Sequence, residues 1–399
     1  MYALGNEHRS IKFGLDRIRT VLDELGRPEK AFYAVHVAGT NGKGSTCAMI
    51  ESGLREAGVR TGLYISPHLV QPTERIRIAG VPVSDAEFSD AFDHVHDACL
   101  RLEREGGIDM HTTYFETLTA MSFLLFRAKG VETAVLEVGM GGRLDATNVV
   151  DPRLAVITPI DFDHENYLGD TIPKIATEKA GIIKPGRPVV ISSQRPEAFE
   201  VCFARARELN APFIDASCSA DFSPPSGFPL LGAHQFDNAR TAATALATLG
   251  VDASAIERGL RSVRWPGRLE FIRRQPDVLL DGAHNPAGAA ALAAYLERFH
   301  KGRRILIVFA AMHDKDLHRL GDTLFPYAAE VVFTAPDNSR AWPPDEMQQI
   351  TGRTQASQVI PRVADALAWA RAHAGPDDLI LVTGSLYLVG EVRALLEDA

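Results

Sequence analysis

The sequence predicts an α/β protein of two domains: a P-loop-type domain with a mostly parallel sheet at residues 1–265, and a smaller Rossmann-like α/β domain at 266–399. Short, continuously apolar runs, typical of buried parallel strands, alternate with longer segments whose apolar residues recur at helical spacing. A chain of 399 residues also exceeds what one hydrophobic core usually supports. The alternation starts afresh after the turn at residues 265–268, which is therefore the predicted domain boundary.

Composition narrows the class of protein. Hydrophobic residues make up 46% of the chain and charged residues 23%, the balance of an ordinary globular protein. A net charge of −9 disfavours a general binder of nucleic acid or anionic membranes, so an anionic ligand requires local positive charge. The four cysteines include no C-x-x-C pair, which indicates reduced thiols and a cytoplasmic protein. We find no signal-like start and no run of about 18 apolar residues.

The first domain is organised around residues 34–46, an apolar strand that breaks into a glycine-rich turn before a helix. Such a turn points backbone N–H groups at a bound anion, and the helix N-terminus adds positive charge. Lys43 is expected on the phosphates of a nucleotide, with a hydroxyl of Ser45 or Thr46 available to Mg²⁺. The spacing departs from the usual G-x-x-x-x-G-K-[ST] pattern, because only two residues separate Gly39 from Gly42.

Polar side chains follow three more predicted strands of this domain. Ser66 comes after the strand at 60–65, Glu137 ends the strand at 133–136, and His164 follows the strand at 154–160. The carboxyl ends of parallel strands form the ligand-binding edge of an open sheet. An acid at such an end, beside a phosphate loop, predicts a Mg²⁺ site.

Helices are predicted at residues 10–22, 47–57, 84–105, 113–128, 171–180, 196–209 and 254–263, and from the end of the segment 232–238 to residue 249, with a further strand at 188–192. The helix at 113–128 begins with Thr113, Tyr114, Phe115 and Glu116. Its Glu116 has two interpretations of equal weight: a first-turn acid favoured by the helix dipole, or a substrate contact. Lys179, on the helix at 171–180, carries no local signal of function.

The second domain repeats the strand–helix alternation. Strands are predicted at 278–280, 305–309, 331–334 and 379–383, each followed by one helix, and Asp281, His284 and Asn285 follow the first of them. A cleft between the domains would close over a nucleoside triphosphate and Mg²⁺, with an arginine such as Arg268 neutralising charge. These local arguments leave three classes open: a carboxylate-activating ligase, a small-molecule kinase, and a nucleotide switch or motor.

Nine motifs, spread over nearly the whole chain and in the same order, resemble those of folylpolyglutamate synthases, the folate branch of the Mur ligase family. They occupy residues 38–46, 66–68, 136–148, 163–164, 178–182, 234–239, 266–268, 281–286 and 383–390. The resemblance implies an ATP-dependent amide ligase, in which a substrate carboxylate attacks the γ-phosphate of ATP and the amine of L-glutamate then displaces phosphate. It favours the ligase over the kinase. It also implies a monomer, and a monovalent cation besides the divalent one.

The resemblance also implies roles for individual residues. ATP would be held by Thr40, Asn41, Gly42, Lys43, Gly44, Ser45, Asn238, Arg268 and Asp281. Ser66, Glu137 and His164 would bind Mg²⁺, and Lys179 matches a carbamylated lysine that binds a second Mg²⁺. Lys43, Lys179 and His284 would be the catalytic residues, with His284 near the reacting phosphate.

Bacterial members of this branch often use both dihydropteroate and reduced folates, and the resemblance implies both activities here. The acceptor would be bound by Thr113, Tyr114, Phe115, Glu116, Leu144, Asp145 and Ala146. Met140 stands where the family usually has leucine, a swap that conserves volume, and residues 71–73 change a loop near the substrate. The alternatives are a polyglutamylating enzyme without dihydropteroate activity and, in another class, a phosphotransferase or a non-catalytic ATP-binding relative.

Overall fold

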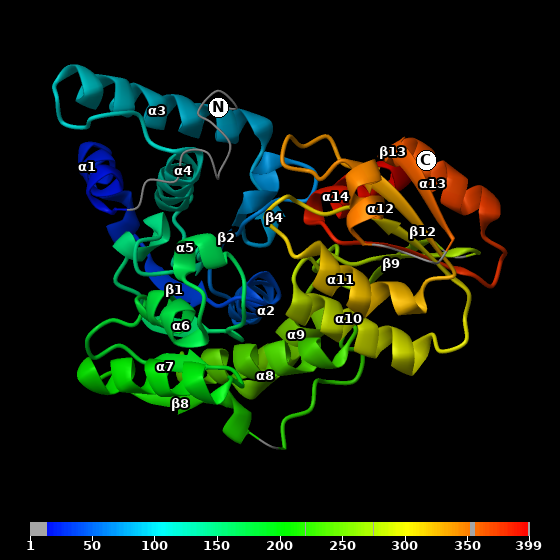
Figure 1. Cartoon of the computed structure of the whole chain (residues 1–399). Coiled ribbons are helices and arrows are strands. Elements are labelled where there is room, and N and C mark those ends of the chain that lie inside the picture. Colours follow the sequence, from blue (N-terminus) through cyan, green and yellow to red (C-terminus); the bar gives the residue numbers. More distant parts are fainter. Residues whose placement is uncertain (1–13, 220, 274, 352–355, 398–399) are drawn as a thin grey trace.

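The computed structural model describes residues 14–219, 221–273, 275–351 and 356–397. Two sheets form two domains, coloured blue to green and yellow to red in Figure 1. The last helix before the second sheet ends at Ser262 and that sheet begins at Glu270, so the predicted boundary lies in the connection between the two. None of the helices in the described part of the chain is long and apolar enough to cross a bilayer.

The first sheet has eight strands in the order β4-β3-β2-β5-β1-β6-β7-β8. The six strands from β2 to β8 run parallel, while β3 and β4 form an antiparallel extension at one edge. Pairing of Val37 with Glu137 brings the ends of β1 and β5 together beneath the glycine-rich turn. The strands are β1 Tyr33–Ala38, β2 Thr61–Tyr64, β3 Ile76–Ile78, β4 Val81–Pro82, β5 Thr133–Glu137, β6 Leu154–Ile157, β7 Val189–Ile191 and β8 Phe213–Asp215.

Helices cover both faces of this sheet, because alternate strand residues point to opposite sides. Val35 and Val37 pack with α2 Lys43–Glu56, α8 Ala233–Thr248 and α9 Ala253–Ser262. The other face is covered by α1 Asp16–Glu24, α3 Asp85–Arg104 and α4 Tyr114–Ala128 on one half, and by α5 Glu165–Leu168, α6 Ile172–Ala180 and α7 Pro196–Glu208 on the other. A Cβ on Gly259 of α9 would lie 2.5 Å from the Cα of Gly53, so glycine sets the approach of α2 and α9.

The second sheet has six strands in the order β13-β12-β11-β14-β10-β9, all parallel except β9. Its strands are β9 Glu270–Arg273, β10 Asp277–Leu280, β11 Ile305–Phe309, β12 Glu330–Ala335, β13 Ser357–Arg362 and β14 Leu379–Thr383. One face packs against α10 Pro286–Phe299, α11 Leu317–Leu324 and α12 Pro344–Ile350, the other against α13 Val363–His373 and α14 Leu386–Glu397.

The structure differs from the predicted elements at the sheet edges. The prediction omitted β13 and α13, and also β3, β4, β8 and β9. β13 is half-exposed and mixes polar and apolar residues, so it lacks the continuous apolar run by which the inner strands are found. The first helix begins at Asp16 instead of residue 10, and residues 10–13 lie outside the described range.

Candidate active site

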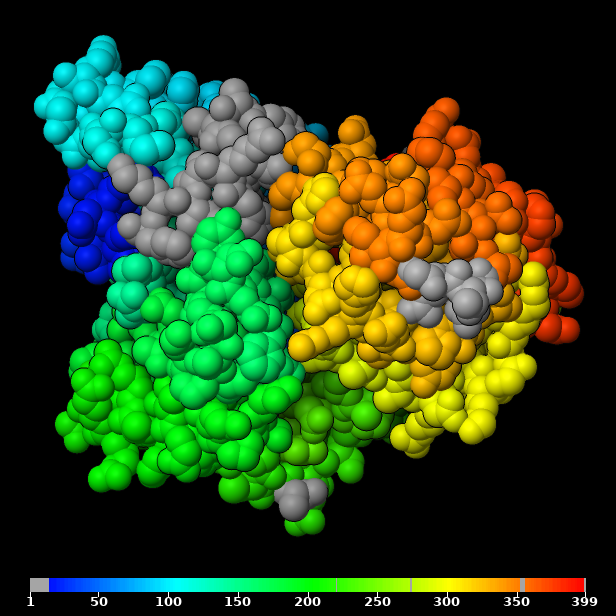
Figure 2. Space-filling view, in the orientation of Figure 1, coloured from blue at the N-terminus to red at the C-terminus, as the bar shows by residue number. Residues whose placement is uncertain are grey.

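A cavity of about 470 Å³ lies between the two domains, at the carboxyl ends of the parallel strands of both sheets. Figure 2 shows the second domain packed against the first along a seam. The predicted residues that line the cavity are Thr40, Asn41, Gly42, Lys43, Gly44, Ser45, Ser66, Thr113, Phe115, Glu116, Glu137, Leu144, Asp145, Ala146, His164, Lys179, Asn238, Arg268, Asp281 and His284. Tyr114 is the exception: its buried ring lies under the guanidinium of Arg75.

The glycine-rich turn is held against its neighbours too closely for larger residues. Gly39 and Gly42 both have positive φ, at 150° and 83°. A Cβ on Gly39 would lie 1.8 Å from Thr158 Oγ1, and one on Gly42 would lie 2.3 Å from Asn238 Oδ1. The turn therefore requires glycine at both positions, and it ends at the N-terminus of α2.

Two lysines meet at this turn. Lys43 Nζ donates hydrogen bonds to the carbonyls of Gly39 and Thr40, at 3.2 and 3.1 Å, and Lys179 Nζ donates to the same Gly39 carbonyl at 2.8 Å. In the described part of the chain neither lysine forms an ion pair with a carboxylate. Burial, and next the charge of Lys43, lowers the pKa of Lys179 to about 7. Lys43 and the N-terminus of α2 therefore present positive charge to an anion, with the Lys179 amine beside them.

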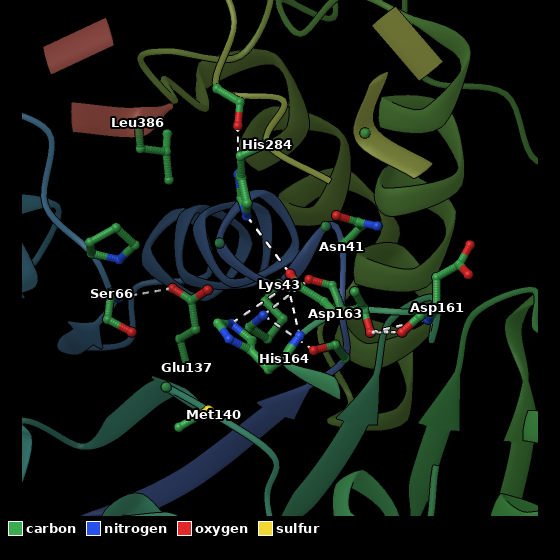
Figure 3. Close-up of a pocket in the computed structure, with 18 of the residues that line it drawn as sticks. Asn41, Lys43, Ser66, Glu137, Met140, Asp161, Asp163, His164, His284 and Leu386 are labelled. Carbon is green, nitrogen blue, oxygen red and sulfur yellow. Dashed lines mark hydrogen bonds and ion pairs between the residues drawn. The ribbon is translucent and has the colours of Figure 1, made fainter. Parts of the chain in front are cut away.

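Glu137 and Ser66 lie on the side of Lys43 opposite Asp161, and His164 lies close by (Figure 3). The Ser66 N–H donates to Glu137 Oε2 at 3.1 Å, and burial raises the pKa of this carboxyl against the opposing charge of Lys43. His164, at a φ of 53°, lies 3.9 Å from a carboxylate oxygen of Asp163 and of Asp314.

Glu137 and Ser66 suit a magnesium ion that also binds water and substrate phosphates, and do not suit a metal ion whose ligands all come from the protein. No group of three His, Cys, Asp or Glu in the described residues could hold a metal ion. Glu137 and the Ser66 hydroxyl instead offer one or two hard oxygens beside a phosphate site. That is the donor set that Mg²⁺ takes when it keeps waters and binds substrate phosphates.

A cluster that sequence reasoning missed joins the domains at this point. Asp163 accepts hydrogen bonds from Lys315 Nζ at 2.7 Å and from Asn285 Nδ2 at 3.2 Å. Asn285 Nδ2 also lies 3.0 Å from Asn41 Oδ1 of the glycine-rich turn. Burial opposes it, but the charges of His164, Lys315 and His284 hold the pKa of Asp163 below its usual range. We call these four residues, Asn41, Asp163, Asn285 and Lys315, the interdomain clasp.

The second domain contributes two residues, His284 and Asp281, whose orientation is fixed by local hydrogen bonds. His284 Nδ1 lies 2.7 Å from the Gly282 carbonyl, and burial followed by the charge of Lys315 lowers its pKa to about 4. The ring is therefore neutral at pH 7, with Nε2 3.9 Å from Asp163 Oδ2. Asp281 accepts N–H bonds from Leu269 and Ala283, both at 2.9 Å, so its carboxylate orders the loop that follows β10.

At the acceptor end of the cavity the two predicted carboxylates already have protein partners. Glu116 Oε2 accepts from Arg17 at 2.7 Å and from the Thr113 N–H at 2.8 Å, as part of a capping box that begins α4. Asp145 accepts from the N–H groups of Gly139 and Met140, at 3.0 Å each, and from Thr147. Glu116 is therefore a first-turn acid that caps α4, as one of its two interpretations predicted. It also lines the cavity, and a contact with substrate stays a prediction.

The comparisons with known proteins agree with this architecture. The Mur ligase middle domain matches residues 37–223, and the Mur ligase glutamate ligase domain matches residues 267–386. The chain is 35% identical to the dihydrofolate synthase/folylpolyglutamate synthase of Bacillus subtilis, over 97% of this chain and 96% of that protein. It is 39% identical to a probable bifunctional folylpolyglutamate synthase/dihydropteroate synthase of Haloferax volcanii, but spans only 48% of its length.

Solved structures give the same relationship. A folylpolyglutamate synthase of Mycobacterium tuberculosis, complexed with ADP and AMPPCP, has a TM-score of 0.90 at 33% identity, covering 96% of this chain and 95% of that one. Escherichia coli FolC in complex with DHPP and ADP has a TM-score of 0.89 at 32% identity, covering 99% and 96%. This chain therefore belongs to the Mur ligase family of ATP-dependent, amide-bond-forming ligases, in its dihydrofolate synthase/folylpolyglutamate synthase branch.

Proposed function

We propose that the chain ligates L-glutamate to dihydropteroate, giving dihydrofolate, and to the γ-carboxylate of reduced folates, through an acyl phosphate. The observation that carries the proposal is the two-ended cavity: Lys43, Lys179 and the N-terminus of α2 at one end, and an apolar wall with Phe115 and Leu144 at the other. The bacterial relatives named for both activities and the FolC complex with DHPP support both acceptors.

The residues present account for each requirement of the reaction. The glycine-rich turn and Lys43 would hold the β- and γ-phosphates, and the interdomain clasp would fix the turn to the second domain. Neutral His284, whose Nδ1–H donates to the Gly282 carbonyl, would offer Nε2 as a proton acceptor without adding a charge near the phosphate. Glu137, Ser66 and His164 would hold Mg²⁺, which neutralises developing phosphate charge when bound. The relative from Yersinia pestis was solved with AMPPNP and a manganese ion.

The test is an assay of phosphate release with ATP, Mg²⁺ and L-glutamate, offering dihydropteroate and tetrahydrofolate separately and identifying products by mass. Product from both acceptors supports the dual activity. Product from tetrahydrofolate alone leaves the polyglutamylating enzyme. Phosphate release that does not depend on glutamate would indicate a phosphotransferase, and the absence of turnover a non-catalytic relative. Potassium and sodium, compared in the same assay, test the monovalent cation.

We further propose that Lys179 is carbamylated and holds a second Mg²⁺. The lowered pKa leaves much of the amine neutral near pH 7, the form that reacts with carbon dioxide, and its position 2.8 Å from the Gly39 carbonyl puts it beside the phosphate site. We expect a 44 Da mass increase on the Lys179 peptide under non-acidic conditions, and a large loss of turnover in Lys179→Ala that short carboxylates partly restore. A fully active enzyme with an unmodified Lys179 would contradict this role.

A further inference from the structure

A second cavity, of about 240 Å³, adjoins the first at Ser66 and Glu137, and no described residue of the acceptor end lines it. The β3–β4 extension, the connection between the domains and α14 enclose it, and its wall includes Arg77, Trp265 and Arg393. Ser66, Glu137 and Arg268 line both cavities. The second cavity therefore gives access to the phosphate site by a route separate from the acceptor's.

The carboxylates around this second cavity are already engaged. Glu74 accepts N–H bonds from Leu69, Val70 and Gln71, at 2.8 to 3.0 Å. Arg393, in turn, pairs with Glu270 at 3.4 Å and Glu397 at 2.8 Å. The charges of Glu74 and of the nearby Glu51 still act on Arg77 at longer range, and Glu137 also lines this cavity.

Two guanidinium groups in the same wall have no such partner. Arg77 donates only to the Glu74 carbonyl, at 3.3 Å, and lies 5.6 Å from the centroid of the Trp265 ring. Within the described residues neither Arg77 nor Arg268 forms an ion pair with a carboxylate. Burial, helped by the charge of Arg393, lowers the pKa of Arg77 against the opposing charges of Glu74 and Glu51, neither of which forms a direct ion pair with it. Arginine binds carboxylates in a planar geometry with two parallel hydrogen bonds. We therefore expect the group that pairs with Arg77 to be the carboxylate of a ligand.

We propose that the second cavity binds the amino-acid substrate, with Arg77 holding one of its carboxylates. This inference rests on the proposed function and deepens it. The volume suits a five-carbon amino acid and is too small for a pteroyl acceptor. In the proposed function ATP and the acceptor would occupy the first cavity, so the attacking amine needs a separate approach, and Ser66 and Glu137 line both cavities.

The test compares Arg77→Gln, Arg77→Lys and the control Arg60→Gln, which changes an exposed arginine just before β2. We expect Arg77→Gln to raise the KM for L-glutamate by roughly ten- to a hundredfold, the loss of one charge-assisted pair. KM values for ATP and the acceptor, and kcat at saturating glutamate, should change less than about threefold. The KM for glutamate of Arg77→Lys should lie between those of the wild type and Arg77→Gln, because lysine keeps the charge but lacks the planar guanidinium that donates two hydrogen bonds. The wild type should also prefer glutamate over glutamine more strongly than Arg77→Gln does.

The outcomes separate this inference from the proposed function. A wild type without glutamate-dependent turnover would overturn the proposed function. A wild type that turns over, with an unchanged KM for glutamate in a folded Arg77→Gln, would overturn this inference alone. If Arg77→Gln does not fold, Arg77→Lys is decisive, and an unchanged KM again overturns it. Inorganic phosphate is the second probe: weaker inhibition by phosphate in Arg77→Gln with an unchanged KM for glutamate would show a phosphate site, contrary to the proposal.

Discussion

The two ends of the main cavity use charge in opposite ways. At the phosphate end, Lys43 and Lys179 both donate to the Gly39 carbonyl and have no carboxylate partner among the described residues. At the acceptor end, Glu116 and Asp145 are buried and satisfied by protein donors. Charges without protein partners remain available to a ligand, whereas satisfied charges fix the wall around it. The comparison predicts that substitutions at the first end change catalysis, and those at the second change stability.

The largest effect is expected from Lys43→Ala. Loss of this cation should lower kcat/KM by roughly 10³-fold, as for other groups that stabilise transition-state charge. Stability should change little, because the charge of Lys43 disfavours the protonated form of Lys179 but favours the ionised form of Glu137. Steady-state kinetics and thermal unfolding measure the two effects. Lys174→Ala, which removes an exposed lysine paired with Asp170, is the control and should change neither.

Glu137→Ala is a separate test of the metal site, and it is expected to abolish product formation.

The interdomain clasp has charges that are paired within the protein, like those of the acceptor end, but it lies beside the phosphate end of the cavity. Asp163→Asn should destabilise the protein by about 4 kcal/mol, because it leaves Lys315 buried with only Asp314 nearby. The double variant Asp163→Asn, Lys315→Met should recover part of this loss, as measured by chemical denaturation. Additive losses in the double variant would mean that the pair does not hold the domains together.

Glu116→Gln tests the acceptor end. The side chains of Arg17 and Glu116 are 8% and 7% exposed, so removing the carboxylate charge leaves a buried arginine unpaired. We expect a loss of about 3 kcal/mol in the free energy of unfolding, and a similar loss for Arg17→Met. The KM for the acceptor should rise together with the loss of stability, because both follow from weaker packing of α4. A raised KM with unchanged stability would instead show that Glu116 acts mainly on the substrate.

Local sequence signals predicted part of this cavity, whereas Lys179 and Asn238, which also line it, were predicted only through the family resemblance. Glycines before Lys43, Glu137 at a strand end and Asp281 after β10 all lie where adjacent residues predict them. The pairs that the sequence did not reveal span long distances: Asp163 and Lys315 are 152 residues apart, and Arg17 and Glu116 are 99 apart. No periodicity or turn pattern joins such residues, since only the packing of the two sheets and their helices brings them together. Glu116 illustrates the limit, because a capping box explains its position in the sequence but not its buried ion pair.

The smallest effect is expected beneath the acceptor end, at His36. Its Nε2 lies 2.8 Å from Thr147 Oγ1, which donates to Asp145, so the ring donates from Nε2 to Thr147. Burial, and next the charge of Lys184, lowers the pKa of His36 to about 3. Between that value and about 6.5, the unfolded chain binds a proton that the folded chain does not, so stability falls as pH falls. The contribution is about 2 kcal/mol lost between pH 7 and pH 5.

Urea unfolding at pH 7 and pH 5 measures this loss. His36→Gln, which keeps an N–H donor without a titrating group, should show a smaller drop than the wild type by about 2 kcal/mol. His94→Gln changes a surface histidine on α3 and should keep the wild-type drop. Equal drops in all three proteins would mean that His36 is protonated in the folded state. In that case a buried positive charge would lie beneath the acceptor end, behind Thr147 and Asp145.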